Sequence, residues 1–343
     1  MRAAERILST VAEPFLIEGR EVRTSASVGI ALSTPAHERA EDLLQDADVA
    51  MRRAKAMGGS RCEVFDEAMH TRAVNRLKLE AEWRAALEKS QFRVCYQSIV
   101  HLETKQITGF EALLRWQHPE QGLISLGKFM AASGDRRLLA STVQWLILQA
   151  CTQLRAWDAE TASDETVSIN VNVSASQLAD DAFVTGVEAT LRSTGVAPSR
   201  LRLELAESAA ADDAKLTSTV LSNLKRLGVG VILDDFGTGI SSLSGLRRFP
   251  VEALKIDRAL ISGMLLDRGV LDTVELIILV AHKLKLKVIA KGIESAKHLD
   301  HLRQSGCELG QGDLFSQPVE AKAAEELLRQ RTPAPQAKVA GAQ

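Results

Sequence analysis

From Phe92 to about Gln330, short apolar runs alternate regularly with stretches of helical spacing. Strands that alternate with helical patterns of about ten residues or more are typical of parallel β/α units. Eight such strands close a barrel, so we predict an α/β protein with a TIM-like (β/α)8 barrel. The predicted strands are Arg93 to Val100, Gly109 to Trp116, Val167 to Val173, Leu201 to Leu205, Gly230 to Asp234, Ala253 to Asp257, Lys287 to Ala290 and Cys307 to Gly310.

A polar or ionisable residue stands at or near the carboxyl end of nearly every predicted strand. In a barrel these ends converge on one mouth, where chemistry is built. Each residue taken alone is read more simply as a solvated strand end or a capping side chain, but together they predict a site. They are Gln97, Glu111, Asn172, Glu204, Asp234 with Asp235, Lys255 with Asp257, Lys291 and Gln311.

Four of these side chains are carboxylates, which are costly to gather in one cavity unless cations neutralise them. An all-oxygen set suits Mg²⁺ or Mn²⁺, and no Cys or His cluster in the sequence points to zinc. Asn170 and Asn172 have the same strand parity, so alternation cannot choose which amide joins the set. The segment Asp234-Asp-Phe-Gly-Thr-Gly239 runs from a strand end into a glycine-rich loop, where two aspartates can touch two ions. A plain acidic turn is the alternative reading of that segment.

Composition limits the partners and the compartment. The chain has 343 residues, 45% hydrophobic and 25% charged, which is enough for one large globular domain and a fragment. Its net charge of −2 offers no broad attraction to DNA, RNA or an anionic membrane. The four cysteines form no C-x-x-C pair, which argues against a zinc site or a disulfide framework and favours a reducing cytoplasm. No signal pattern or long apolar stretch is found, so we expect a soluble chain.

Before the barrel, the chain carries a smaller pattern. Val22 to Leu32 alternates toward an apolar strand, and Glu41 to Met57 has helical spacing up to Gly58-Gly59. We expect a partial α/β domain over residues 1–66, a linker helix over 67–90 with Leu79, Trp83 and Leu87 on one face, the barrel over 91–330 and a disordered tail over 331–343.

The N-terminal segment resembles the C-terminal part of GGDEF domains. The matching residues are Ser27-Val-Gly-Ile-Ala31 and Ala47-Asp-Val-Ala-Met51, followed by Ala54-Lys55. The Gly-Gly-(Asp/Glu)-Glu-Phe turn, which binds substrate and metal in that family, occurs nowhere in this sequence. The resemblance therefore implies a truncated remnant without diguanylate cyclase activity.

The barrel segment resembles the EAL-domain cyclic di-GMP phosphodiesterases. The resemblance begins at Glu111-Ala-Leu-Leu-Arg-Trp116 with His118-Pro119 and continues in order for about 250 residues. The further matching segments are Asn172-Val-Ser174, Glu204-Leu-Ala-Glu-Ser208, Asp234 to Leu243, Lys255-Ile-Asp257 and Gln311-Gly312.

The resemblance implies two-metal hydrolysis of cyclic di-GMP to linear pGpG. One Mg²⁺ or Mn²⁺ ion would be held by Glu111, Asn172, Glu204 and Asp234, and a second would be shared by Asp234 and Asp235. A water activated between the ions attacks a phosphodiester in line. Lys255 would orient that water, Arg115 would grip a phosphate oxygen and Glu207 would anchor the Asp235 loop, while Glu294 is assigned to the catalytic group. Gln97 and Gln311 would help to hold substrate or water, and a homodimer is expected.

The chain departs from the family pattern at a metal ligand. The seventh strand of the family usually ends Ala-Glu-Gly-Val-Glu, and its first glutamate binds the second ion, but here the segment is Ala290-Lys-Gly-Ile-Glu294. An ammonium about 4 Å from a divalent ion is repelled by about 8 kcal/mol at an effective dielectric constant of about 20. The second metal site should be weak or absent, unless Lys291 swings to solvent and a water replaces it. Smaller departures are Ala206, Ile240 and Asp313.

Three functions remain open at this point. The first is an active but slow cyclic di-GMP phosphodiesterase. The second is a cyclic di-GMP receptor that does not hydrolyse its ligand, which Lys291 motivates. The third is a scaffold for dimerisation or docking, which the intact Glu111 to Trp116 and Asp234 to Gly239 segments make least favoured.

Overall fold

The computed structural model of the chain describes most residues in two compact units, Met1–Ala85 and Ala86–Gln343. The tail expected at 331–343, the first part of the expected linker helix and Ile240 lie outside the described residues. The domain boundaries expected from the sequence stay predictions. The described residues are 1–17, 20–22, 24–34, 39–66, 81–125, 136–160, 167–208, 214–237 and 249–330.

The N-terminal unit contains the predicted strand and helix. Strand β3 pairs in parallel with β4, and helix α2 packs against both. A side chain at Gly29 in β3 would collide with the carbonyl oxygen of Ala47 in α2, so glycine is what lets the two elements approach. The elements of this unit are α1 (Arg2–Ala12), β1 (Phe15–Ile17), β2 (Arg20–Val22), β3 (Val28–Ile30), α2 (Ala40–Ala56) and β4 (Cys62–Val64), and residues 81–88 are helical.

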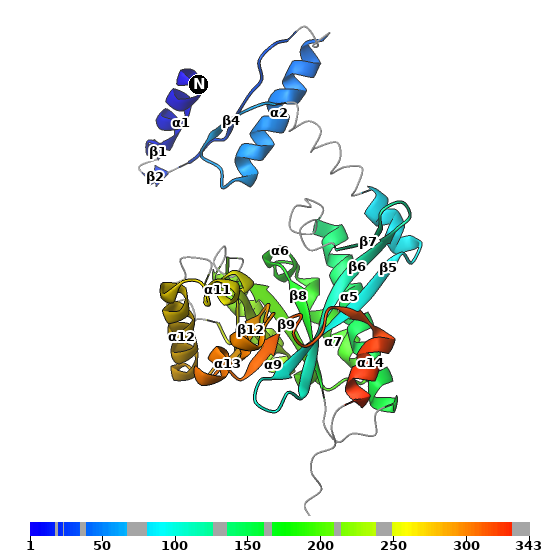
Figure 1. Ribbon diagram of the computed structural model, residues 1–343. Coiled ribbons are helices and arrows are strands. Elements are labelled where there is room, and N and C mark those ends of the chain that lie inside the picture. The colour runs from blue at the N-terminus through cyan, green and yellow to red at the C-terminus, as the bar shows by residue number, and fades with distance from the viewer. Residues whose placement is uncertain are drawn as a thin grey trace, which may run out of the picture. The chain divides into compact units, whose positions relative to one another are not determined.

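The second unit is a closed barrel of eight strands, as predicted (Figure 1). Its strands follow one another in the order β5, β13, β12, β11, β10, β9, β8 and β6, and the pairing of β5 with β6 closes the ring. They are β5 (Phe92–His101), β6 (Ile107–His118), β8 (Ser168–Val173), β9 (Leu201–Ala206), β10 (Gly230–Phe236), β11 (Ala253–Ile256), β12 (Lys287–Lys291) and β13 (Leu309–Gln311).

One strand differs from the parallel pattern expected from the sequence. Strand β5 runs antiparallel to both of its barrel neighbours, β6 and β13. Only the short segment 102–106 joins β5 to β6, and a connection of that length can join only antiparallel neighbours. Along β5, the side chains near the barrel mouth therefore come earlier in the sequence than those deeper in the barrel, which is the reverse of the parallel strands.

Helices cover the outside of the barrel, and α5, α9 and α12 each pack against a strand (Figure 1). Among the described residues, no helix combines the length and apolar composition needed to cross a membrane. The remaining elements are β7 (Gly122–Ser125), α5 (Arg136–Glu160), α6 (Ala175–Leu178), α7 (Ala182–Thr194), η1 (Pro198–Arg200), α9 (Ala214–Leu227), α11 (Arg258–Gly263), α12 (Arg268–Lys283), α13 (Ala296–Gln304), β14 (Val319–Glu320) and α14 (Ala321–Arg329).

Candidate active site

The barrel interior changes from apolar to charged along the strands. The apolar layer consists of Ile99, Ile232, Ala253 and Ile289. Side chains two positions apart on a strand share a face, so the next inward residues of β10, β11 and β12 are Asp234, Lys255 and Lys291. Because β5 is antiparallel, its residue in that polar layer precedes Ile99 and is Gln97. The polar layer therefore lies at the carboxyl ends of the parallel strands, where barrel enzymes place their chemistry.

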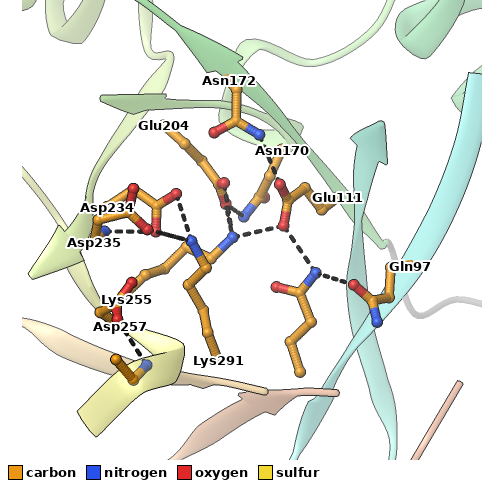
Figure 2. A network of polar contacts seen from close by, with 12 residues as sticks. Gln97, Glu111, Asn170, Asn172, Glu204, Asp234, Asp235, Lys255, Asp257 and Lys291 are labelled. Atoms are coloured by element: carbon orange, nitrogen blue, oxygen red, sulfur yellow. Dashed lines mark hydrogen bonds and ion pairs between the residues drawn. The ribbon is translucent and has the colours of Figure 1, made fainter. Parts of the chain in front are cut away.

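Lys255 is completely buried and lies between two glutamates (Figure 2). Its ammonium donates to Glu111 Oε2 at 2.7 Å and to both carboxylate oxygens of Glu204, at 2.8 and 2.7 Å. Glu111 and Glu204 are 5% and 0% exposed, so neither charge is screened by bulk water. A buried carboxylate needs a cationic partner, and here one ammonium serves two.

Sharing one cation pushes the two glutamate pKa values apart. Burial raises the pKa of Glu111, but the charge and hydrogen bond of Lys255 outweigh it and lower that pKa to about 2. Burial and the neighbouring charge of Glu111 raise the pKa of Glu204 to about 8. Burial disfavours the charged form of Lys255, yet the surrounding carboxylates raise its pKa, so it remains an ammonium.

Both candidate asparagines face the site, one toward each glutamate. Asn172 Nδ2 donates to Glu111 Oε1 at 2.6 Å, and Asn170 Nδ2 donates to Glu204 Oε1 at 2.7 Å. Strand alternation could not decide which of the two asparagines joins the site. In the structure both do, each with a different glutamate as its partner. The sequence analysis named Asn170 as an alternative to Asn172, because the two share a face, but it did not predict the contact of Asn170 with Glu204.

Lys291 points into the barrel mouth and not to solvent (Figure 2). Its ammonium donates to both carboxylate oxygens of Asp234 at 2.9 Å and to Asp235 Oδ1 at 2.6 Å. Burial and the charge of Lys255 lower the pKa of Lys291, but the aspartates outweigh them and raise it overall. Lys291 therefore bridges the two aspartates expected to share an ion.

A β-bulge turns both aspartates toward the mouth. Between the pairs Leu233–Leu254 and Phe236–Ile256, the register of β10 and β11 shifts, so Asp234 and Asp235 together lie opposite Lys255. Asp235 has φ 53°, a left-handed conformation that a non-glycine residue adopts rarely. Neighbouring strand residues normally point to opposite faces, and bulges beside active sites re-aim such side chains. Sequence reasoning named both residues but did not foresee the bulge.

Glu207 contacts the backbone that follows the bulge. Its Oε2 accepts a hydrogen bond at 2.9 Å from the backbone N–H of Gly237, two residues after Asp235. Glu207 is 5% exposed, and its other carboxylate oxygen has no partner among the described residues. This contact ties the end of β9 to the start of the glycine-rich loop.

Comparison with known proteins identifies the barrel. The family model described as "EAL domain" matches residues 80–318, which is more than half of the chain. The chain belongs to the EAL domain family. A shorter match, "Diguanylate cyclase, GGDEF domain", covers residues 1–61 and confirms the N-terminal resemblance.

The curated relatives of this EAL protein match nearly all of it and are longer. "Cyclic di-GMP phosphodiesterase NbdA" of Pseudomonas aeruginosa is 36% identical over 95% of this chain, which spans 41% of NbdA. "Cyclic di-GMP phosphodiesterase PdeR" of Escherichia coli is 36% identical over 94% of this chain, which spans 48% of PdeR. The chain thus spans about half or less of the length of these curated relatives.

A solved structure of similar fold is described as "PaMucR Phosphodiesterase, c-di-GMP complex". It is 36% identical, with a TM-score of 0.69, and the match covers 72% of this chain and 99% of that one. The TIM-like fold predicted from the sequence is confirmed.

Gln97 and Gln311 line one side of the EAL barrel mouth. Gln311 Nε2 donates to Gln97 Oε1 and to Glu111 Oε2, each at 2.8 Å. A cavity of ≈ 200 Å³ opens there, lined by Gln97, Glu111, Lys291, Glu294, Gln311 and Asp313, among others. The departure at Asp313 therefore lies on the wall of this cavity.

Three further residues named in the sequence analysis have other partners. Glu294 forms an ion pair with Arg258 at the cavity wall. Arg115 follows Leu113, a residue of that wall, along β6, and its guanidinium donates to the Leu114 carbonyl oxygen at 3.0 Å. Asp257 caps α11 by accepting from the Ala259 N–H at 2.7 Å, which is a structural role.

The donor set fits one divalent ion better than two. Among the described residues, no three acidic, histidine or cysteine side chains already surround a common metal position. The oxygen ligands of the first expected set come from the neighbouring strands β6, β8, β9 and β10 and suit Mg²⁺ or Mn²⁺. The second expected set does not fit an ion, because the Lys291 ammonium contacts both of its members, Asp234 and Asp235. In the first set of four ligands, Lys255 contacts only the two glutamates.

Proposed function

We propose that this chain binds cyclic di-GMP at the mouth of its EAL barrel and hydrolyses it slowly to linear pGpG. The convergence of Glu111, Asn172, Glu204 and Asp234 from four neighbouring strands carries the proposal. The names of NbdA and PdeR, and the MucR complex with c-di-GMP, support the ligand. Because the chain is shorter than its curated relatives, its own activity has to be measured.

In this proposal the four converging side chains hold one Mg²⁺ or Mn²⁺ ion. A divalent ion bound there acts as a Lewis acid toward a phosphoryl oxygen and lowers the pKa of a water molecule. Lys255 offsets the charge of Glu111 and Glu204, which it contacts directly. We also assign to it the orientation of a water molecule. Glu207 fixes the backbone that presents Asp235.

The substrate would enter the cavity beside Lys291. Gln97 and Gln311 offer amide groups to the nucleotide or to water, and the cavity also exposes Glu294. Cyclic di-GMP carries two phosphodiester anions, so the Lys291 ammonium and the Arg115 guanidinium supply complementary charge. Arg115 is assigned the grip on a phosphate oxygen.

The contacts of Lys291 favour a second candidate, a cyclic di-GMP receptor that does not turn its ligand over. An ammonium that bridges Asp234 and Asp235 leaves no ligand set for a second ion, while the remaining cavity can still bind the dinucleotide. The two candidates differ only in turnover.

The deciding experiment follows pGpG by chromatography while cyclic di-GMP binding is titrated by calorimetry, with Mn²⁺ or Mg²⁺ present. Binding with slow product formation supports the phosphodiesterase, and binding without product supports the receptor. If neither binding nor product is found, the phosphodiesterase and the receptor are both contradicted, and the scaffold is the remaining function. Incubation with GTP should give no cyclic di-GMP, because the N-terminal segment lacks the Gly-Gly-(Asp/Glu)-Glu-Phe turn.

We further propose a cytoplasmic homodimer. All four cysteines are free in the structure, which supports a reducing compartment. Light scattering on the purified chain measures the oligomeric state, and a monomer across the concentration range would contradict the dimer.

A further inference from the structure

We infer that the ammonium of Lys291 is a built-in replacement for the second divalent ion, so that the centre takes up one divalent ion per chain. The inference deepens the proposed function, on which its meaning for cyclic di-GMP rests. It starts from the three contacts that Lys291 makes to Asp234 and Asp235, the two residues expected to share that ion.

The inward direction of the Lys291 side chain is set by its place in strand β12. Lys291 is not a flexible residue on the surface. Lys291 ends β12 two residues after Ile289, which belongs to the apolar layer of the barrel interior, and therefore shares its inward face. Its side chain is only 22% exposed. The alternative in which Lys291 turns to solvent and a water takes its place is therefore not the arrangement that the structure adopts.

Charge balance explains why one further ion suffices. The centre gathers four carboxylates, those of Glu111, Glu204, Asp234 and Asp235, around the two ammonium groups of Lys255 and Lys291. A bound divalent ion keeps its carboxylate ligands ionised. With the ion in place, four negative and two positive charges leave two negative charges, which that ion neutralises. A second divalent ion would give the centre an excess of positive charge and would contact the Lys291 ammonium.

The first ion and Lys291 share only one residue, Asp234, and do not compete for the other three ligands of the ion. Of the first set, only Asp234 also contacts Lys291, and each carboxylate oxygen has two lone pairs, so Asp234 can serve both cations. Glu111, Asn172 and Glu204 lie on the side of the site that Lys255 occupies. One divalent ion and one ammonium can therefore share Asp234, as two ions would.

For the ligand, the consequence is that a phosphodiester meets one metal ion and one ammonium. An ammonium attracts a phosphate oxygen, but it cannot lower the pKa of a water molecule as a divalent ion does. We therefore expect that binding of cyclic di-GMP would be retained, while a water at the centre would have one activating divalent ion in place of two and turnover would be slow.

The test is Mn²⁺ binding to the whole chain, followed by equilibrium dialysis and electron paramagnetic resonance. We expect one Mn²⁺ per wild-type chain, with the six-line spectrum of an isolated ion. In Lys291→Glu we expect two, with the broadened spectrum of two ions that share a carboxylate. Lys287→Glu makes the same charge change at the exposed start of β12 and should keep a stoichiometry of one.

The wild-type measurement alone can overturn the inference. Two Mn²⁺ ions in the wild-type chain, or none, would contradict it, and so would a folded Lys291→Glu variant that still takes up only one. Cyclic di-GMP is titrated separately into the same Mn²⁺-loaded protein. One bound Mn²⁺ without nucleotide binding would leave the metal inference standing and would refute the proposed function instead.

Discussion

The ammonium nitrogen of Lys291 lies 2.6 Å from Asp235 Oδ1, although β11 separates their strands, β12 and β10, in the barrel. The strand between them, β11, carries Lys255. Its ammonium donates hydrogen bonds to Glu111 and Glu204, as that of Lys291 does to the two aspartates. Two lysines thus divide four carboxylates between them. This division decides how many cations the centre can still accept.

Lys291→Glu should raise the rate of pGpG formation with Mn²⁺ by about tenfold or more, because it restores an oxygen ligand and removes a charge that repels the second ion. Steady-state chromatography of pGpG measures the effect. Lys287→Glu is the matched control and should leave the rate unchanged. An unchanged rate in a Lys291→Glu protein that binds two ions would show that another departure, such as Asp313, limits turnover.

Lys255→Met should lower the free energy of unfolding by about 3–5 kcal/mol, because Glu111 and Glu204 stay buried without their shared cation. Urea denaturation in the presence of a chelator measures this loss, and added Mn²⁺ should restore part of it. Lys287→Met removes an exposed ammonium and should change the free energy by less than about 0.5 kcal/mol. An equally small loss for Lys255→Met would contradict a stabilising role for its ammonium between the two glutamates.

Asn170→Ala should weaken Mn²⁺ binding by about tenfold, because the amide that orients Glu204 is removed while every expected ligand remains. Calorimetric titration gives the affinity, and thermal unfolding shows whether the fold is kept. Asn223→Ala on the outer helix α9 deletes an amide of the same size, which accepts from Arg226 at 3.3 Å, and should not change the affinity. If both variants bind Mn²⁺ like the wild type, Asn170 does not position Glu204.

Glu207→Ala should speed hydrogen exchange at the Gly237 amide by about fivefold, because a hydrogen bond with a net contribution of about 1 kcal/mol is lost. Exchange measured by mass spectrometry on a peptide that contains residues 235–237 tests this. Glu207→Gln keeps an acceptor oxygen and should exchange nearly as slowly as the wild type. Equal acceleration in both variants would mean that the charge, and not the hydrogen bond, holds the segment.

Much of the barrel could be predicted because its pattern is local. All eight predicted strands are present, and the polar residues at the ends of the parallel strands do meet at one mouth. The direction of β5 was not predicted, since an apolar run reads the same in either direction and only the short connection to β6 decides it. Likewise, parity could not tell Asn170 from Asn172, because both face inward.

The sequence by itself determined the chemistry available to the site, namely the carboxylates, the amides and the two lysines, Lys255 and Lys291. Only the tertiary structure decided how these charges pair. The bulge at Asp234 and Asp235 depends on the register between β10 and β11. The inward direction of Lys291 depends on burial of the polar layer at the barrel mouth. Such pairings join strands far apart in the chain, and their energies depend on distances that no local pattern of residues encodes.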